Sequence, residues 1–290
     1  MRNQTHPIIS RRWLLAIPAF GLSLTFASSA QAQATAADSV RDTTHSQTQA
    51  PFFTHKDLVL AGMFAGATIL AAPLDKRAAQ ELLQPGTQTN KFLKQTSTGV
   101  EAIASPGAIF IGGALYAVGK IGKFDRVADL GWHGTEAVLF ATGVTYVLKG
   151  TVGRGRPFLS NGEDPDDFHL GKGFSSGDWT SFPSGHTSTA FAAAAAVTNE
   201  TTRWWPHSTW IVGPLMYGGA TAVGLSRMYH SRHWASDVAL GAAIGTFSGR
   251  KVVQYAHGHP GNKLDRLILH TSVIPNARGG GVLAFSFPAP

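Results

Sequence analysis

The sequence lacks cysteine altogether and is poor in charged residues. Its 290 residues include no Cys, and Asp, Glu, Lys and Arg together make up 14%, against about 25% in a typical soluble domain. The absence of Cys excludes disulfide frameworks, Cys-ligated zinc, iron–sulfur clusters and thiol nucleophiles. The apolar content of 43% excludes intrinsic disorder, and the scarcity of charge excludes a highly charged nucleic-acid arm.

The N-terminus has the features of an export signal. The segment 1–12 contains Arg2, Arg11 and Arg12. A charge-free stretch follows at 13–27, and Ala30-Gln31-Ala32 after it has a small-x-small pattern. This order is typical of a cleaved signal peptide, and the short apolar core favours cleavage over an uncleaved anchor. We predict a signal peptide at 1–32, a polar linker at 33–54, and export to the cell envelope.

The positive net charge is small once this leader is removed. The whole chain carries +7. Cleavage removes three positive charges and no negative ones, which leaves +4. We interpret the remaining excess as part of an anion-binding site, and we expect no nucleic-acid partner.

Six charge-free blocks follow the linker. All are rich in Ala, Gly, Leu, Val and Phe, and none alternates with a period of two, so each predicts a helix. The blocks lie at 58–74, 102–119, 137–148, 187–199, 204–226 and 238–249. We therefore predict an all-α fold, a bundle of about six helices over 55–256 with the active site at helix ends. The tail at 257–290 fits either a docked strand or a loose end.

The low charge favours a membrane-embedded bundle. A membrane-spanning helix needs about 20 apolar residues, and three of the six blocks approach this length. The shorter blocks fit a buried core helix equally well, or a span whose charged ends reach a polar surface.

Three short motifs carry charged residues and histidines between the predicted helices. The first runs from Lys149 to Pro157 and places Lys149 and Arg156 seven residues apart, two turns on one helical face. Its three glycines permit close approach of the backbone to a ligand. Taken alone, this motif fits a solvated basic helix end equally well.

The second motif is Pro183-Ser184-Gly185-His186, directly before a predicted helix. The free N–H groups of a helix N-terminus bind anions, and Gly185 permits close approach. His186 can donate or accept a proton near neutral pH. The alternative is ordinary capping of the helix by Ser184 or Thr187, with His186 on the surface.

The third motif contains Ser226, Arg227, His233 and Asp237. His233 and Asp237 are four residues apart and share a helical face, so the carboxylate can accept the Nδ1 proton and leave Nε2 free as nucleophile or base. Arg227 offers a planar donor fork that suits phosphate oxygens. A purely structural His–Asp pair is the alternative, and the spacing to Asp237 favours His233 over His230.

Together the motifs supply the groups that phosphoryl transfer needs: positive charge, a nucleophile and an acid. No group of Asp, Glu and His has a spacing typical of divalent-metal ligands, and there is no P-loop. We therefore expect the positive charge to come from Lys and Arg, and we predict no metal and no cofactor.

These motifs resemble the signature of the type 2 phosphatidic acid phosphatase / vanadium-dependent haloperoxidase superfamily. The three parts of that signature are K-x6-R-P, P-S-G-H and S-R-x5-H-x3-D. They stand here at 149–157, 183–186 and 226–237 without any departure. The helical pattern extends the resemblance over about 55–256.

The resemblance implies a role for each signature residue. His233 would be the nucleophile that forms a phosphohistidine, and Asp237 would orient it. His186 would be the general acid that protonates the leaving alkoxide and then helps to activate water. The groups that would hold the phosphoryl oxygens are Lys149, Arg156, Ser184, Gly185 and Arg227.

The resemblance implies a metal-independent phosphatase of a phosphomonoester or pyrophosphate, and we expect a lipid phosphate as substrate. The site would face the periplasm or the exterior, and no protein partner is inferred. The alternative is a soluble periplasmic non-specific acid phosphatase. A vanadium haloperoxidase, in which His233 would ligate vanadate, is disfavoured by the short chain, and a degenerate envelope protein by the complete signature.

Overall fold

The computed structural model describes residues 53–259, residues 262, 265 and 268, and the backbone of two later strands. The predicted signal peptide and the linker before Phe53 lie outside the described residues. Within the described part, residues 102, 103 and 105 are described by their backbone alone.

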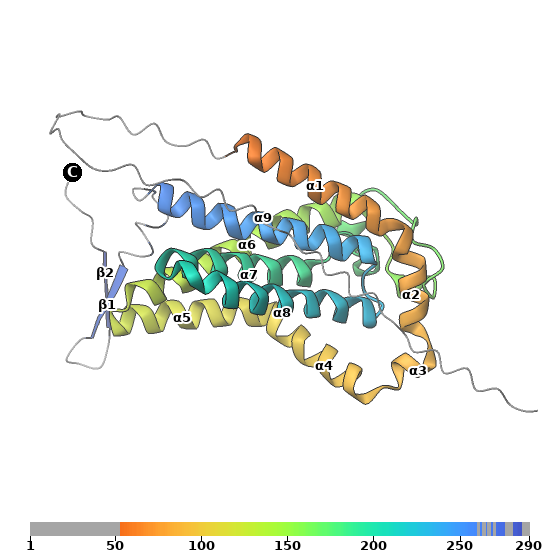
Figure 1. Cartoon of the computed structure of the whole chain (residues 1–290), viewed down its shortest axis with the longest axis horizontal. Coiled ribbons are helices and arrows are strands. Elements are labelled where there is room, and N and C mark those ends of the chain that lie inside the picture. The colour runs from red at the N-terminus through yellow and green to blue at the C-terminus, as the bar shows by residue number, and fades with distance from the viewer. Residues whose placement is uncertain are drawn as a thin grey trace, which may run out of the picture. The chain divides into compact units, whose positions relative to one another are not determined.

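This part of the chain is built mainly from α-helices. Their bounds are His55–Ala71 (α1), Asp75–Leu83 (α2), Pro85–Gln88 (α3), Lys91–Ala102 (α4), Ala108–Gly122 (α5), Asp125–Val152 (α6), Gly185–Trp204 (α7), Thr209–Tyr229 (α8) and Ala235–Gly258 (α9). Helices α5 to α9 run side by side, and α1 lies along α9 (Figure 1). The predicted all-α bundle is confirmed, since every charge-free block lies mainly on a helix.

The tail contains a short antiparallel hairpin. Strands Thr271–Pro275 (β1) and Gly281–Phe285 (β2) pair with Thr271 opposite Phe285. Just before β1, the carbonyl of Ile268 accepts a hydrogen bond from the hydroxyl of Tyr116 on α5 at 2.5 Å. The apolar end of the tail is therefore a strand and not a loose end.

Small residues fill the interior of the bundle. Most of the buried apolar residues are alanines. The central cluster consists of Ala137, Val138, Ala141, Ala192, Ala196 and Val253. Side chains of this size let helices approach until their backbones are in contact.

Helices α7 and α9 are in backbone contact. Gly241, Gly245 and Gly249 repeat every four residues along α9 and face the backbone of α7. A Cβ atom at these glycines would lie 2.6, 2.2 and 2.4 Å from the backbone oxygens opposite. Those oxygens belong to Ser184, Ser188 and Ala192. The glycines therefore fix the register of α9 on α7, beginning at the N-terminus of α7.

Large apolar side chains lie on the outside of the bundle. Leu70, Ile121, Tyr146, Trp210 and Leu215 are all mostly exposed, on α1, α5, α6 and α8. One stretch among the described helices, His55–Leu83, is long and apolar enough to cross a membrane by length and composition. None of its most apolar window is buried in the fold.

Candidate active site

The three sequence motifs meet at one end of the bundle. The first begins in the last turn of α6 and continues past its end, the second begins α7, and the third connects α8 with α9. The N–H of Ser184 donates to the carbonyl of Asp237 at 2.9 Å, which joins the second motif to the third. The indole N–H of Trp234 donates to the carbonyl of Gly155 at 2.9 Å, which joins the third to the first.

The first and second motifs are also in direct contact. A Cβ atom on Gly185 would lie 3.4 Å from Cε of Lys149, so the lysine side chain passes beside the start of α7. The N–H of Ser181 donates to the carbonyl of Arg154 at 3.0 Å. The structure thus brings residues from all three motifs to the N-terminus of α7.

The start of α7 combines a cap with an exposed histidine. Ser184 is the N-cap residue, and its buried hydroxyl accepts a hydrogen bond from the N–H of Thr187. The side chain of His186 in the first turn is 30% exposed. The capping alternative is therefore correct for Ser184, and it coexists with an accessible imidazole beside the free N–H groups of the helix.

The proton on His233 is fixed by a backbone carbonyl. Nδ1 of His233 lies 2.6 Å from the carbonyl oxygen of Ser181, and the histidine is 3% exposed. A carbonyl oxygen only accepts hydrogen bonds, so Nδ1 carries the proton and Nε2 keeps its lone pair. This is the tautomer that a nucleophilic Nε2 requires.

The expected hydrogen bond from His233 to Asp237 is replaced by this contact. Nδ1 of His233 and Oδ2 of Asp237 are 3.7 Å apart. Asp237 lies in the first turn of α9, and its carboxylate instead accepts the N–H of Trp234 at 2.8 Å and the hydroxyl of Ser181 at 2.5 Å. Ser181 therefore connects the two residues, because its hydroxyl bonds Asp237 while its carbonyl bonds His233.

A buried arginine holds Asp237 in place. Arg154 is 3% exposed, and its guanidinium bonds Asp237 at 2.6 Å and Asp75 at 2.8 Å. Asp75 at the start of α2 in turn accepts the N–H of Ser236 at 2.8 Å. Sequence reasoning missed this role, since Arg154 lies inside the first motif but outside the signature positions. Removing one partner of such a buried ion pair costs about 3–5 kcal/mol.

The loop before α7 positions two of the predicted phosphate ligands. The ammonium of Lys149 donates to the carbonyl of Thr180. Arg156 bonds the hydroxyl of Thr180 at 2.8 Å and the carbonyl of Gly177 at 3.0 Å. Their partners are neutral carbonyl and hydroxyl oxygens, so these bonds do not neutralise the positive charge of either side chain.

Sequence reasoning also missed a glutamate at the site. Glu101, in the last turn of α4, forms an ion pair with Arg227, and its carboxylate lies 3.9 Å from Nε2 of His186 and 3.7 Å from Nε2 of His230. The sequence did carry a signal, because Glu101 is the only charged residue between Lys94 and Lys120.

Burial and positive charge shift the pKa values of the site. Burial and the charge of Arg156 lower the pKa of Lys149 to about 7. Burial and the charge of Arg227 lower the pKa of His186 to about 4. Burial, together with the charge of Lys149, lowers the pKa of His233 to about 3 and keeps this imidazole neutral at physiological pH. A bound anion would relieve the repulsion among these cations.

Fold and site define a helical bundle in which cationic side chains and two histidines gather at the start of one helix. Residues 131–259 match the family model of the PAP2 superfamily. Over 71 residues it is 45% identical to the lipid A 1-phosphatase of Porphyromonas gingivalis, a segment that covers 24% of this chain and 15% of that relative. The chain thus matches a small part of this curated relative.

Two solved structures resemble the bundle. One is a transmembrane PAP2-type phosphatidylglycerolphosphate phosphatase from Bacillus subtilis, with a TM-score of 0.51 and 19% identity, covering 70% of this chain and 97% of that one. The other is LpxE from Aquifex aeolicus, with a TM-score of 0.45 and 22% identity, covering 63% of this chain and 96% of that one. The first of these shows that the chain shares the fold.

Proposed function

We propose that this protein is a phosphatase that hydrolyses a phosphomonoester or pyrophosphate of a lipid. The observation that carries the proposal is the state of His233: a neutral imidazole with its proton fixed on Nδ1, near the cations Lys149 and Arg156. Such a group is suited to act as a nucleophile, and the neighbouring cations are suited to hold a phosphoryl group. The superfamily match supports the same reaction class.

In the first step, Nε2 of His233 attacks phosphorus, and the bond from phosphorus to the leaving oxygen breaks. His186 gives its proton to that oxygen, so the product leaves as an alcohol or, from a pyrophosphate, as a phosphate monoester. His186 is largely neutral in the free site because of its lowered pKa. The negative charge of the phosphate raises that pKa, and we expect His186 to gain its proton as the substrate binds.

In the second step, water attacks the phosphohistidine. The neutral His186 accepts a proton from the water, the bond between phosphorus and Nε2 breaks, and inorganic phosphate leaves. Lys149, Arg156 and Arg227 stabilise the charge on the phosphoryl oxygens in both steps. All of these groups come from the chain itself, so the reaction as proposed uses no metal.

The apolar exterior supports a substrate in a membrane. Large exposed apolar side chains on α1, α5, α6 and α8 suit contact with lipid, and alanine and glycine suit the contacts between helices. The two relatives named as phosphatases of lipid A and of phosphatidylglycerolphosphate support a lipid phosphate as substrate. We propose an exported protein, embedded in the membrane, with the site at the periplasmic or exterior surface.

The test is phosphate release by the purified full chain in EDTA. Long-chain phosphatidate in detergent micelles is compared with p-nitrophenyl phosphate, and the His233→Asn variant serves as the blank. We expect release from phosphatidate, a strong preference for it over the small ester, and inhibition by orthovanadate, which mimics the five-coordinate transition state. Equal turnover of the small ester would instead indicate a non-specific acid phosphatase. Release from neither substrate would contradict the proposal.

A further inference from the structure

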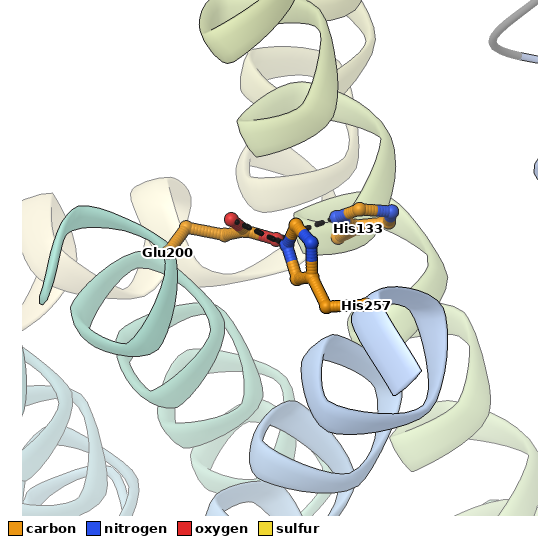
Figure 2. A group of neighbouring side chains, drawn as sticks. All are labelled: His133, Glu200 and His257. Carbon is orange, nitrogen blue, oxygen red and sulfur yellow. Dashed lines mark hydrogen bonds and ion pairs between the residues drawn. The ribbon is translucent and has the colours of Figure 1, made fainter. Parts of the chain in front are cut away.

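Two histidines and a glutamate from three helices meet inside the bundle, far from the phosphate site. His133 lies on α6, Glu200 on α7 and His257 on α9, and the carboxylate points between the two imidazoles (Figure 2). One carboxylate oxygen is 2.5 Å from Nδ1 of His133 and 2.9 Å from Nε2 of His257. One ligand atom from each residue lies within 4.8 Å of the other two.

Burial makes this cluster unusual. Glu200 is fully buried and the side chain of His133 is 3% exposed, whereas that of His257 is 23% exposed and gives access from solvent. A buried carboxylate needs a positive partner. The ion pairs that Glu200 forms within the described chain are to these two imidazoles, which carry positive charge only when protonated.

A second carboxylate, that of Asp265, lies on the side of His133 that faces away from Glu200. Oδ2 of Asp265 lies 3.5 Å from Nε2 of His133, the ring nitrogen that faces away from Glu200. That nitrogen is buried and has no hydrogen-bond partner within the described part of the chain. Asp265 is itself held by the indole N–H of Trp132 at 2.9 Å and by Asn262 at 2.7 Å. A metal-bound histidine characteristically donates its other ring N–H to a carboxylate in this position.

We propose that His133, Glu200 and His257 bind a divalent transition-metal ion, with Zn²⁺ as the best fit. Two imidazole nitrogens and one carboxylate oxygen form a known zinc ligand set, and imidazole disfavours Mg²⁺ and Ca²⁺. Bonds to zinc are about 2.0–2.2 Å long, which sets tetrahedral ligand atoms about 3.3 Å apart, so the Glu200 oxygen needs to move away from each imidazole nitrogen by less than about 1 Å. Asp129, one turn before His133 on the same face of α6, lies within electrostatic reach of all three and is the candidate fourth ligand.

The proposed metal would be structural. His133 precedes Lys149 by sixteen residues on α6, or about 24 Å at 1.5 Å per residue. Glu200 follows His186 by fourteen residues on α7, or about 21 Å. The ion would therefore join α6, α7 and α9 at the end of the bundle opposite to the phosphate site, and it would take no part in phosphoryl transfer.

Chain spacing could not reveal this site. Glu200 is 67 positions from His133 and 57 from His257, so no local motif contains two of the ligands. The prediction of no metal was based on the spacing of residues along the chain. The proposed ligands come from three separate helices and meet only when these helices pack together.

The test is metal binding by the purified full chain without a histidine tag. We measure bound zinc by mass spectrometry after dialysis, the affinity by competition with a chromophoric chelator, and the visible spectrum after Co²⁺ is added. We expect one Zn²⁺ per chain and the intense Co²⁺ bands typical of four-coordinate nitrogen and oxygen ligation. Addition of Zn²⁺ should raise the unfolding temperature, and a chelator should reverse this.

Variants distinguish the site from adventitious binding. Glu200→Gln and His257→Asn should each abolish stoichiometric binding, and Asp265→Asn should weaken it by about 10–100-fold. His207→Asn, a change at an exposed histidine outside the cluster, should bind as the parent does. If the parent binds no zinc and gives no Co²⁺ bands, or if folded Glu200→Gln and His257→Asn bind as tightly as the parent, the cluster is held by protons alone and the proposal is wrong. Phosphatase activity in EDTA is a separate measurement and tests only the proposed function.

Discussion

At the scale of single residues, Ser181 shows what a signature leaves out. Its carbonyl oxygen fixes the proton of His233 and its hydroxyl donates to Asp237. The spacing of His233 and Asp237 predicted a direct hydrogen bond between them. This is wrong, because the carboxylate of Asp237 accepts the N–H of Trp234 and the hydroxyl of Ser181 instead. The convergence of the three motifs was predictable from their residue types. Ser181, Arg154 and Glu101 were not, because their roles depend on contacts between distant segments.

Replacing His233 with Asn should remove activity and preserve the fold. The Asn amide can still donate to the carbonyl of Ser181, but it offers no nucleophile, so we expect kcat for phosphate release to fall by at least about 10³-fold. His230→Asn is the matched control, since His230 lies nearby and contacts Glu101. It should keep kcat within about tenfold of the parent. Comparable losses in both variants, with circular dichroism unchanged, would contradict the assignment of the nucleophile.

The lowered pKa of Lys149 predicts an alkaline limb in the pH profile. Only the ammonium form attracts phosphate, and in the free site its pKa is about 7. We therefore expect kcat/KM to fall as the pH rises above about 7. Arginine stays protonated throughout this range, so in Lys149→Arg the limb should move to higher pH even if the maximum is lower. Profiles of kcat/KM measured from pH 5 to 10 for both proteins check this. If the alkaline limb of Lys149→Arg lies at the same pH as in the parent, another group causes it.

At the scale of elements, the charge-free blocks of the sequence predicted where helices lie but not where they end. The twelve-residue block at 137–148 lies within α6, which has 28 residues. The helix was underestimated because it continues through polar and charged turns, among them His133 and Lys149. Helices α2 and α4 were not predicted, since α2 carries several charges of both signs and α4 is largely polar. Both nevertheless contribute side chains to the candidate site, Asp75 from α2 and Glu101 from α4.

The glycines of α9 give a prediction about stability. A methyl group on Gly245 would lie 2.2 Å from the backbone oxygen of Ser188, so Gly245→Ala must push α9 away from α7. We expect a loss of about 1–3 kcal/mol in unfolding free energy. Gly218→Ala is the control, because nothing lies within 4 Å of its added Cβ in α8. It should be neutral or stabilising by up to about 1 kcal/mol. Chemical unfolding in detergent compares them, and equal stability of the two variants would show that α9 can shift without cost.

At the scale of the whole molecule, the distribution of side-chain size predicts where the protein resides. Alanine and glycine lie between the helices, whereas many large apolar side chains, among them Leu70, Ile121 and Trp210, lie outside. We expect the full chain to stay with the membrane fraction after alkaline carbonate washing and to require detergent for extraction. Fractionation of expressing cells checks this. Recovery in the soluble periplasmic fraction without detergent would favour the acid-phosphatase alternative.

The order of the site residues along the chain has a consequence for when activity can arise. The first two motifs are made before α9, but Asp237 and the glycines that dock α9 on α7 come later. A partly synthesised chain therefore holds cations and His186 without a placed nucleophile. For the phosphatase that we propose, activity would therefore begin only once α9 is docked on α7.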